Sequence, residues 1–159
     1  MNCSPAHSRA IDQINASCYD PSELQRFETR SEEETIELGR KIASQLPKRA
    51  VVLLIGNLGA GKTTLAKGII SGLGAAAPEE VSSPTFTLIH EYGSAYHIDL
   101  YRLDHAAQVA GLGLDEIFDR EAVVLIEWGE RFPELMPAER IEIRLSAAGG
   151  DVRVIEMLD

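Results

Sequence analysis

The stretch that most constrains this chain is GNLGAGKTTL, at residues 56–65, which follows directly on the apolar run VVLLI. Its first eight residues fit G-x-x-x-x-G-K-[ST], the pattern of a loop that cradles the phosphates of a nucleotide. In such a loop the glycines let successive backbone N–H groups point at the phosphates, and the following helix adds the positive end of its dipole. An apolar strand before the loop and a helix after it are the context that this motif requires. The sequence therefore predicts a nucleoside triphosphate as ligand.

The loop supplies most of the residues that are expected to bind the nucleotide, which are Gly56, Gly59, Ala60, Gly61, Lys62, Thr63 and Thr64. Lys62 is expected to reach the β- and γ-phosphates, and the Thr63 hydroxyl to ligate Mg²⁺. A carboxylate at the end of a neighbouring apolar strand normally completes such a metal site. Glu127 closes the run VVLIE and fits that description, although a strand-end carboxylate that faces solvent is the alternative.

Three further residues have weaker support from their patterns alone. Asp99 shares a face of a predicted strand with His97, one β repeat away, but the polar face of an exposed strand explains this pattern equally well. Thr85 lies in SSPTF, a loop of the kind in which nucleotide switches place a threonine that senses the γ-phosphate, and also an ordinary loop sequence. Trp128 follows Glu127. If strand alternation continues, its ring faces away from Glu127, which suits packing or a partner surface.

The order of strand and helix patterns predicts an α/β fold, the three-layer P-loop NTPase fold, with a mainly parallel central sheet and antiparallel edge strands. A capping box of Ser31 and Glu34 opens the first predicted helix, which ends at Pro47. Residues 28–159 are expected to form the domain and residues 1–27 a tail that is partly disordered or loosely docked. The other predicted elements are a helix at 62–70, strands at 86–90, 94–103 and 122–128, one or two short helices within 104–118, and a closing hairpin of RIEIRL and VRVIEML.

Charge and cysteine usage restrict the partners and the compartment. The chain has 25 Asp and Glu against 15 Lys and Arg, a formal net charge of −10. Because tight binding to a nucleic-acid backbone needs a basic surface, any RNA is expected to be held by another protein. Free thiols at Cys3 and Cys18 in a reducing compartment are favoured over a disulfide. The N-terminal segment has no apolar core of a signal peptide and no stretch could span a membrane, so a cytoplasmic protein is expected.

The motifs GNLGAGKTTL, SSPTFTLIHEY, HIDLYRL and LIEWGER follow one another in this order along the chain. In these motifs, from about Ser31 to Asp159, the chain resembles the TsaE (formerly YjeE) family of bacterial ATPases of tRNA threonylcarbamoyladenosine synthesis. The resemblance implies a small P-loop protein that binds ATP and Mg²⁺ and joins two subunits, TsaB and TsaD. In that complex TsaD carries the threonylcarbamoyl transfer to adenosine 37 of tRNAs that read codons starting with A. The TsaE-like subunit hydrolyses ATP, weakly alone and faster with its partners, to reset the complex between cycles.

The resemblance also implies roles for single residues. Lys62 and Thr63 match the family's P-loop lysine and magnesium threonine, and Thr85 matches the threonine of its S-P-T motif. Asp99 matches the aspartate of H-x-D-L-Y-R, and Glu127 the essential glutamate of I-E-W. The implied catalytic set is therefore Lys62, Thr85, Asp99 and Glu127, and the implied metal ligands are Thr63, Asp99 and Glu127.

Three other positions of the resemblance are less defined. The start of the family's first helix, here around Thr29–Glu32, lies near the nucleotide, so Glu32 joins the expected binding residues. His97 belongs to H-x-D-L-Y-R and is assigned no role beyond shaping the site. In AAGGDVR, where the family often carries a basic residue near Gly, Asp151 follows Gly150 and Arg153 comes two residues later. This departure leaves a C-terminal contact with the nucleotide open.

Two other functions remain alternatives. A small-molecule kinase needs arginines gathered over the transferred phosphoryl group, whereas the arginines that follow the P-loop here are dispersed along the chain. A nucleotide-dependent switch with little turnover would use the same P-loop for binding alone. The chain contains no N-K-x-D stretch, the usual guanine-reading signature, so ATP is preferred over GTP.

Overall fold

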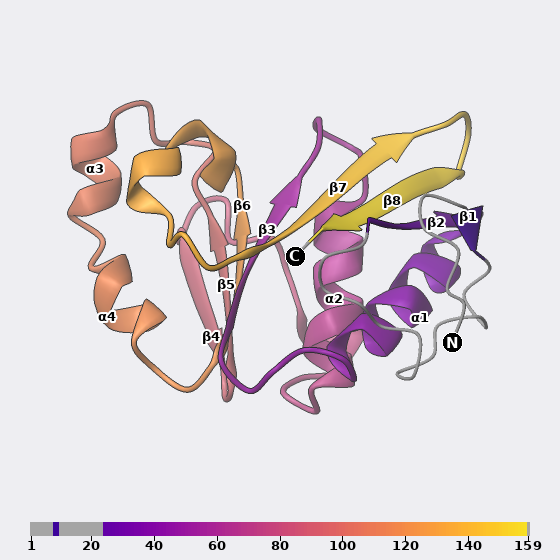
Figure 1. Cartoon of the computed structure of the whole chain (residues 1–159), viewed down its shortest axis with the longest axis horizontal. Helices are drawn as coiled ribbons and strands as arrows, with labels where there is room; N and C mark the ends of the chain where they lie inside the picture. The colour runs from indigo at the N-terminus through magenta and orange to yellow at the C-terminus, as the bar shows by residue number, and fades with distance from the viewer. Residues whose placement is uncertain (1–7, 10–23, 159) are drawn as a thin grey trace.

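The computed structural model describes residues 8–9 and 24–158, which form one mixed sheet with helices on both faces (Figure 1). In the described residues the sheet has eight strands in the order β1-β2-β8-β7-β3-β6-β5-β4. The strands are β1 (Ser8–Arg9), β2 (Gln25–Thr29), β3 (Ala50–Ile55), β4 (Ile89–Tyr92), β5 (Ala95–Asp99), β6 (Val123–Glu127), β7 (Ile141–Ala147) and β8 (Arg153–Leu158). The α-helices are α1 (Glu32–Ala43), α2 (Lys62–Gly72), α3 (Ala106–Ala110) and α4 (Leu114–Phe118), and short 3₁₀ turns are η3 (Pro78–Glu80), η4 (Gly129–Arg131) and η5 (Pro133–Leu135).

The middle of the sheet is parallel, and antiparallel pairs follow on both sides of it, although the outermost pair β1–β2 is again parallel. Strands β7, β3, β6 and β5 pair in parallel, whereas β4 pairs antiparallel with β5, and β8 pairs antiparallel with both β7 and β2. The strand before the P-loop, β3, lies between β6 and β7 in the middle of the sheet. Because both faces of the sheet are covered there, its sequence AVVLLI is apolar throughout. The predicted α/β architecture with a parallel centre is confirmed. Of the two edge strands, β4 is antiparallel to its neighbour as predicted, whereas β1 is parallel to β2.

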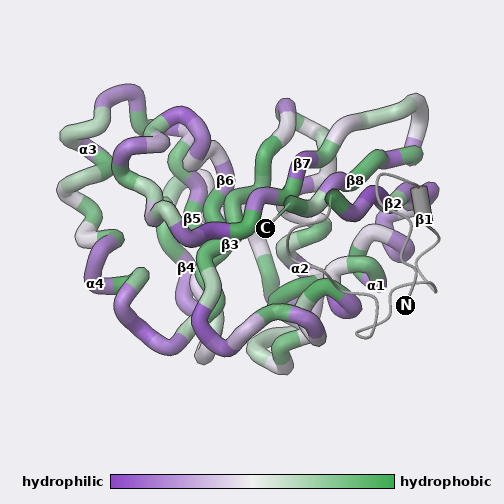
Figure 2. Tube along the Cα trace, viewed as in Figure 1, coloured by the Kyte–Doolittle hydropathy of each residue, from purple (hydrophilic) through white to green (hydrophobic). Residues whose placement is uncertain are grey.

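Each face of the sheet has its own hydrophobic core. Val52 and Leu54 of β3 belong to the core under α1 and α2, whereas Val51 and Leu53 belong to the core on the side of α3 and α4. Figure 2 shows the corresponding pattern along the chain, with hydrophobic segments in the middle strands and alternating hydrophilic and hydrophobic segments in α1 and α4. Because side chains alternate along a strand, one apolar run supplies both cores.

Helices α1 and α2 approach each other more closely than side chains would allow. A Cβ atom built on Gly68 of α2 would lie 2.2 Å from the Ile36 carbonyl oxygen of α1, and one built on Gly39 would lie 2.7 Å from the Leu65 carbonyl oxygen. Glycine is therefore required on both sides of this contact. The contact fixes the start of α1 relative to the start of α2, and both starts border the site described below.

The start of α1 confirms half of the predicted capping box. The Ser31 hydroxyl accepts a hydrogen bond from the Glu34 N–H, as expected for an N-cap. The Glu34 carboxylate, however, accepts from the N–H of Arg30 instead of that of Ser31. The helix ends at Ala43 with its C-cap at Ser44, before Pro47.

The structure differs from the sequence prediction in two segments. Residues 25–27, placed in the tail, belong to β2, and Phe27 is fully buried in the core. The remainder of residues 1–27, apart from Ser8–Arg9 and Leu24, lies outside the described residues, so the division into tail and domain stays a prediction. The strand predicted at 86–90 begins only at Ile89, because Leu88 has a φ of 70°, a left-handed conformation that interrupts an extended strand. In the part of the chain that the structure describes, no helix is long and apolar enough to cross a membrane.

Candidate functional site

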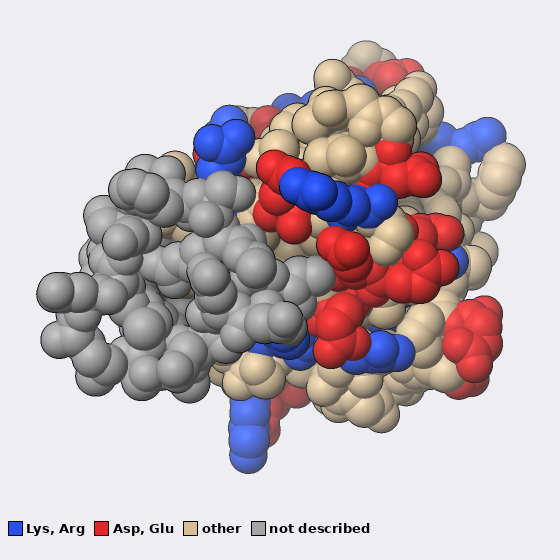
Figure 3. Space-filling model, turned by 90° about the vertical axis from the view of Figure 1, so that its right-hand side faces the viewer, with Lys and Arg blue, Asp and Glu red and all other residues tan. Residues whose placement is uncertain are grey.

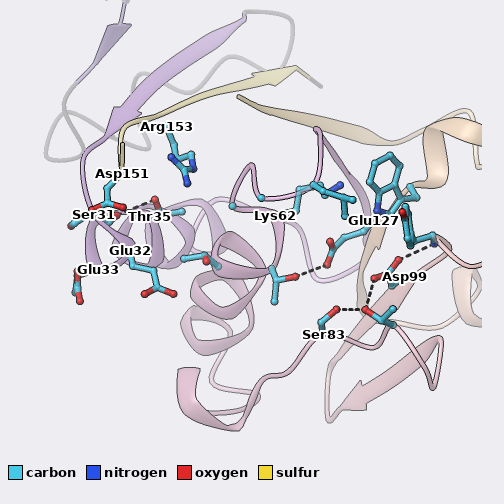
Figure 4. Close-up of a pocket in the computed structure, with 18 residues that line it drawn as sticks. Ser31, Glu32, Glu33, Thr35, Lys62, Ser83, Asp99, Glu127, Asp151 and Arg153 are labelled. Atoms are coloured by element: carbon cyan, nitrogen blue, oxygen red, sulfur yellow. Dashed lines mark hydrogen bonds between the residues drawn. The ribbon is translucent and has the colours of Figure 1, made fainter. Parts of the chain in front are cut away.

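A cavity of about 680 Å³ opens at the carboxyl ends of the central parallel strands. Its walls come from the loop after β3 and the start of α2, the ends of β5 and β6, the loop before β4, the start of α1 and the turn between β7 and β8 (Figure 4). Crevices at the carboxyl ends of strands are where open α/β sheets bind ligands. The cavity is therefore the candidate site, and it extends from buried strand ends to an exposed helix end.

The loop after β3 has the conformation that a phosphate cradle needs. Gly59 and Gly61 have φ angles of 79° and 100°, which favour glycine, and Gly61 caps the N-terminus of α2. Lys62, Thr63 and Thr64 are the first residues of α2, and all of them line the cavity together with the two glycines. The positive end of the α2 dipole therefore points into the cavity.

Gly56 and Ala60, the two remaining loop residues that were predicted to bind the nucleotide, do not line the cavity. They pack on the side of the loop that faces the protein core. A Cβ on Gly56 would lie 2.5 Å from the Leu145 carbonyl oxygen, so the loop leaves β3 in close contact with β7. Ala60 is 3% exposed and belongs to the core beneath α1 and α2. These two residues set the path of the loop, whereas the other five face the cavity.

The Lys62 ammonium lies inside the loop, among acidic groups. Its Nζ donates a hydrogen bond of 2.6 Å to the Gly56 carbonyl and lies 3.6 Å from the centroid of the Trp128 ring. Burial lowers the pKa of Lys62, while the negative charges of Glu127, Glu130 and Asp99 act in the opposite direction. The cavity thus holds a partly desolvated cation that suits an anionic ligand.

Glu127 lies at the centre of the buried end. The parallel register places Glu127 of β6 directly beside Asp99 of β5, so both strands end in a carboxylate at the same edge. Glu127 is 3% exposed, and its Oε2 accepts a hydrogen bond of 3.2 Å from the Thr63 hydroxyl. The same Oε2 lies 2.6 Å from Nε2 of His97, which is fully buried. A solvent-facing Glu127, the alternative reading of the sequence, is therefore wrong.

The Asp99 carboxylate connects the strand end to the loop before β4. Its Oδ1 accepts a hydrogen bond of 2.9 Å from the Tyr101 N–H, and its Oδ2 accepts one of 3.3 Å from the Thr85 hydroxyl. The Thr85 hydroxyl also lies 2.7 Å from that of Ser83 (Figure 4). The structure thus brings together Asp99 and Thr85, two residues that the sequence analysis singled out separately. We call Thr63, Thr85, His97, Asp99 and Glu127 the strand-end group.

The donor atoms of the strand-end group are consistent with a magnesium ion beside a phosphate. Thr63, Asp99 and Glu127 offer oxygen ligands, and Mg²⁺ prefers oxygen and usually takes one or two carboxylates together with phosphates and water. Nowhere in the described residues do three or more His, Cys, Asp or Glu side chains form a cluster that could hold a metal. The residues therefore fit an ion that a bound phosphate and water help to hold, and not a site built from protein ligands alone.

The other end of the cavity combines the first turn of α1 with the β7–β8 turn. Thr35 lines this end from within α1, together with five residues that we call the helix–turn group: Ser31, Glu32, Glu33, Asp151 and Arg153. Glu32, which the family resemblance implies to lie near the nucleotide, thus lies in the cavity wall. The Arg153 guanidinium donates to the carbonyls of Gly150 and Val152, and its Nε lies 3.7 Å from where a Cβ of Gly61 would be. Arg153 therefore reaches the P-loop, a contact that the sequence analysis left open.

Trp128 and Tyr101 also line the cavity, and the prediction for Trp128 is wrong. Its φ of 66° ends the alternation of β6, so the ring turns toward Lys62 instead of away from Glu127. The Tyr101 and Trp128 rings have centroids 5.2 Å apart. Trp128 comes one residue and Tyr101 two residues after a strand-end carboxylate. A change of backbone conformation at that point leaves no signal in the sequence.

Comparison with known proteins shows which family the chain is similar to. The sequence model of the family "Threonylcarbamoyl adenosine biosynthesis protein TsaE" matches residues 29–155. The tRNA threonylcarbamoyladenosine biosynthesis protein TsaE of Bacillus subtilis is 40% identical over 134 residues, 82% of each chain. The proteins of the same name from Haemophilus influenzae and Treponema pallidum are 36% and 38% identical, over 77% and 76% of this chain and 82% and 90% of theirs. The crystal structure of Bacillus subtilis YdiB is similar with a TM-score of 0.69 and 34% identity, over 87% of both chains.

Proposed function

This chain belongs to the TsaE family, and from that premise we propose that it is the accessory ATPase of tRNA threonylcarbamoyladenosine biosynthesis. In this proposal it binds and hydrolyses Mg-ATP to support a TsaB–TsaD complex, which modifies adenosine 37 of tRNAs that read codons starting with A. The observation that carries the proposal is the position of Glu127. It contacts Thr63 of the P-loop through one carboxylate oxygen and closes the buried end of the cavity.

The P-loop and the start of α2 would hold the triphosphate. The backbone N–H groups of residues 59–64 and the α2 dipole would bind the phosphates, with Lys62 moving from the Gly56 carbonyl to the β- and γ-phosphates. Thr63, with the Asp99 and Glu127 carboxylates, would hold magnesium, which neutralises charge that develops on the phosphate oxygens. The helix–turn group would then lie along the remainder of the nucleotide.

Hydrolysis needs a group that orients water and takes its proton. Glu127 would accept a proton from the water whose oxygen attacks the γ-phosphorus, while the bond from that phosphorus to the β–γ bridging oxygen breaks. ADP and inorganic phosphate would be the products. Thr85, hydrogen-bonded to Asp99, would report the presence of the γ-phosphate and its metal to the exposed loop that it belongs to.

Charge supports the proposed route to tRNA through protein partners. The surface around α1 carries exposed Glu32, Glu33, Glu34 and Glu37, and Figure 3 shows acidic side chains gathered on this side of the molecule. With a net charge of −10, the chain would repel a phosphate backbone and would suit a basic protein surface. Contact with tRNA would therefore be indirect, within the complex.

The test is ATP hydrolysis with TsaB and TsaD of the same source, each omitted in turn, by the native chain and by Lys62→Ala. We expect turnover that rises when both partners are present and vanishes in Lys62→Ala, because Lys62 is the loop's cation for the phosphates. Tight ATP binding without hydrolysis, in the presence of both partners, would favour a nucleotide switch. Transfer of the γ-phosphoryl group to a small acceptor would favour a kinase.

A further inference from the structure

His97 is a buried polar residue for which the proposed reaction has no role so far. It lies in the middle of β5, beside Leu125 of β6 and His90 of β4, and its side chain is fully buried. Burying an imidazole costs free energy unless its nitrogen atoms find partners. One nitrogen, Nε2, lies 2.6 Å from Oε2 of Glu127, a short distance for such a pair.

The surroundings of the other nitrogen identify the tautomer. Nδ1 of His97 is buried and finds no hydrogen-bond partner among the described residues. An N–H at this position would be an orphaned donor, whereas a bare lone pair is the less costly choice in an apolar core. A proton therefore belongs on Nε2, where it is donated to the Glu127 carboxylate. The Thr63 hydroxyl donates to the same carboxylate oxygen.

In both side-chain hydrogen bonds that the structure shows at Glu127, the acceptor is the same carboxylate oxygen, Oε2. Thr63 and His97 both donate to Oε2, so Oε1 is the oxygen that remains for water in the cavity. The two donors are not equivalent, because in the proposed reaction the Thr63 hydroxyl turns to the metal. His97 comes from the interior of the sheet and stays in place.

We propose that His97 is the positioning residue of the hydrolytic step: its Nε2–H holds Oε2 of Glu127, so that Oε1 faces the attacking water. This inference rests on the proposed ATPase function. His97 does not touch the nucleotide in this arrangement and takes no proton from the reaction. Its effect is on the direction of the Glu127 carboxylate, and small errors in the position of a reacting group lower rates strongly.

Two substitutions of similar shape separate this role from simple packing. In His97→Gln the amide nitrogen stands as far along the side chain as Nε2 of histidine, so it can still donate to Glu127. His97→Met has nearly the same length and fills the same space without a donor. Thermal unfolding would show that both variants are folded, and calorimetric titration with ATP would show their affinity.

We expect His97→Met to lower kcat for ATP hydrolysis with the partners about 10- to 100-fold, while the KM for ATP changes less than about threefold. His97→Gln should keep kcat within about threefold of the native value. A folded His97→Met with native kcat would overturn the proposal. Equally low kcat in both folded variants would also overturn it, because packing alone would then account for the residue.

A measurement without ATP separates this inference from the proposed function. Nitrogen NMR of the histidine side chains, with the His97 signals identified by their loss in His97→Gln, should show a proton on Nε2 and none on Nδ1. A proton on Nδ1 would overturn the inference even if the chain hydrolyses ATP. If the native chain turns over no faster than Lys62→Ala, the proposed function fails and the proposed role of His97 in hydrolysis fails with it. In that case the NMR result still shows whether His97 donates a hydrogen bond from Nε2 to Glu127, independently of ATP hydrolysis.

Discussion

The two ends of the cavity are built in opposite ways. In the strand-end group, His97, Asp99 and Glu127 are 0%, 5% and 3% exposed, and hydrogen bonds fix their side chains. In the helix–turn group, Glu32, Glu33 and Asp151 are exposed and come from a helix start and a hairpin turn. The buried end suits chemistry that needs fixed geometry, whereas the exposed end suits binding that tolerates adjustment. Substitutions at the first should therefore change rates, and substitutions at the second should change affinities.

The largest effect is expected from Thr63→Val, which keeps the shape of the side chain and removes its hydroxyl. The loss of a proposed magnesium ligand and of a donor to Glu127 should lower Mg²⁺-dependent ATP turnover about 100-fold, or about 3 kcal/mol. Thr63→Ser keeps the hydroxyl and is the matched control. Equal turnover in the two variants would mean that the strand-end group does not act through this oxygen.

The glycine contact between α1 and α2 should keep the strand-end group and the helix–turn group at a fixed separation in the cavity. In Gly68→Ala the new methyl group would lie 2.2 Å from a backbone oxygen of α1, so the helices must move apart. We expect a loss of about 2 kcal/mol in the free energy of unfolding, measured by urea denaturation, together with weaker nucleotide binding. Gly111→Ala, where the nearest atom is 3.5 Å from the new Cβ, is the control. Native stability in Gly68→Ala would contradict the close packing.

Arg153→Gln tests the helix–turn group. The guanidinium lies beside Gly61 at the mouth of the P-loop, where its charge can attract the nucleotide. Its removal should weaken ATP binding about fivefold, the effect of a partly exposed charge worth about 1 kcal/mol. The kcat should stay native. Arg144→Gln, on β7 and outside the lining of the cavity, controls for the loss of a positive charge. If Arg153→Gln lowered kcat and left the affinity for ATP unchanged, the helix–turn group would not act in binding alone, which would contradict the contrast between the two ends of the cavity.

The smallest effect concerns Glu130, next to the strand-end group but outside the cavity lining. Burial raises the pKa of its carboxyl, while Lys62, Arg131 and Arg144 act in the opposite direction. Because the folded pKa is above the unfolded one, the stability from the protonated carboxyl is fully present below the unfolded pKa and is lost as pH rises through the folded pKa. Glu130→Gln should therefore raise the Tm about 1–2 °C at pH 7.5 and leave it unchanged near pH 4. A lower Tm for Glu130→Gln at pH 7.5 would contradict this assignment.

The same contrast separates what the sequence could predict from what it could not. The strand-end group was predictable because each residue has a fixed place: Thr63 follows the loop lysine, and Asp99 and Glu127 close strands whose parallel register brings them together. The position of Arg153 depends on how a hairpin turn folds over the P-loop, and no periodicity encodes that. The direction of Trp128 depends on a single φ angle. His97 was visible in its motif, but only the structure shows which oxygen of Glu127 it contacts.

The most direct test of the account is to measure binding and a single turnover of ATP on the same sample of Glu127→Gln. Glutamine keeps the size of the side chain and cannot take a proton from water. With TsaB and TsaD present, we expect ATP affinity within about threefold of the native value and a single-turnover rate at least about 100-fold lower. A Glu127→Gln chain that hydrolyses ATP at the native rate would contradict the claim that the strand-end group carries the chemistry.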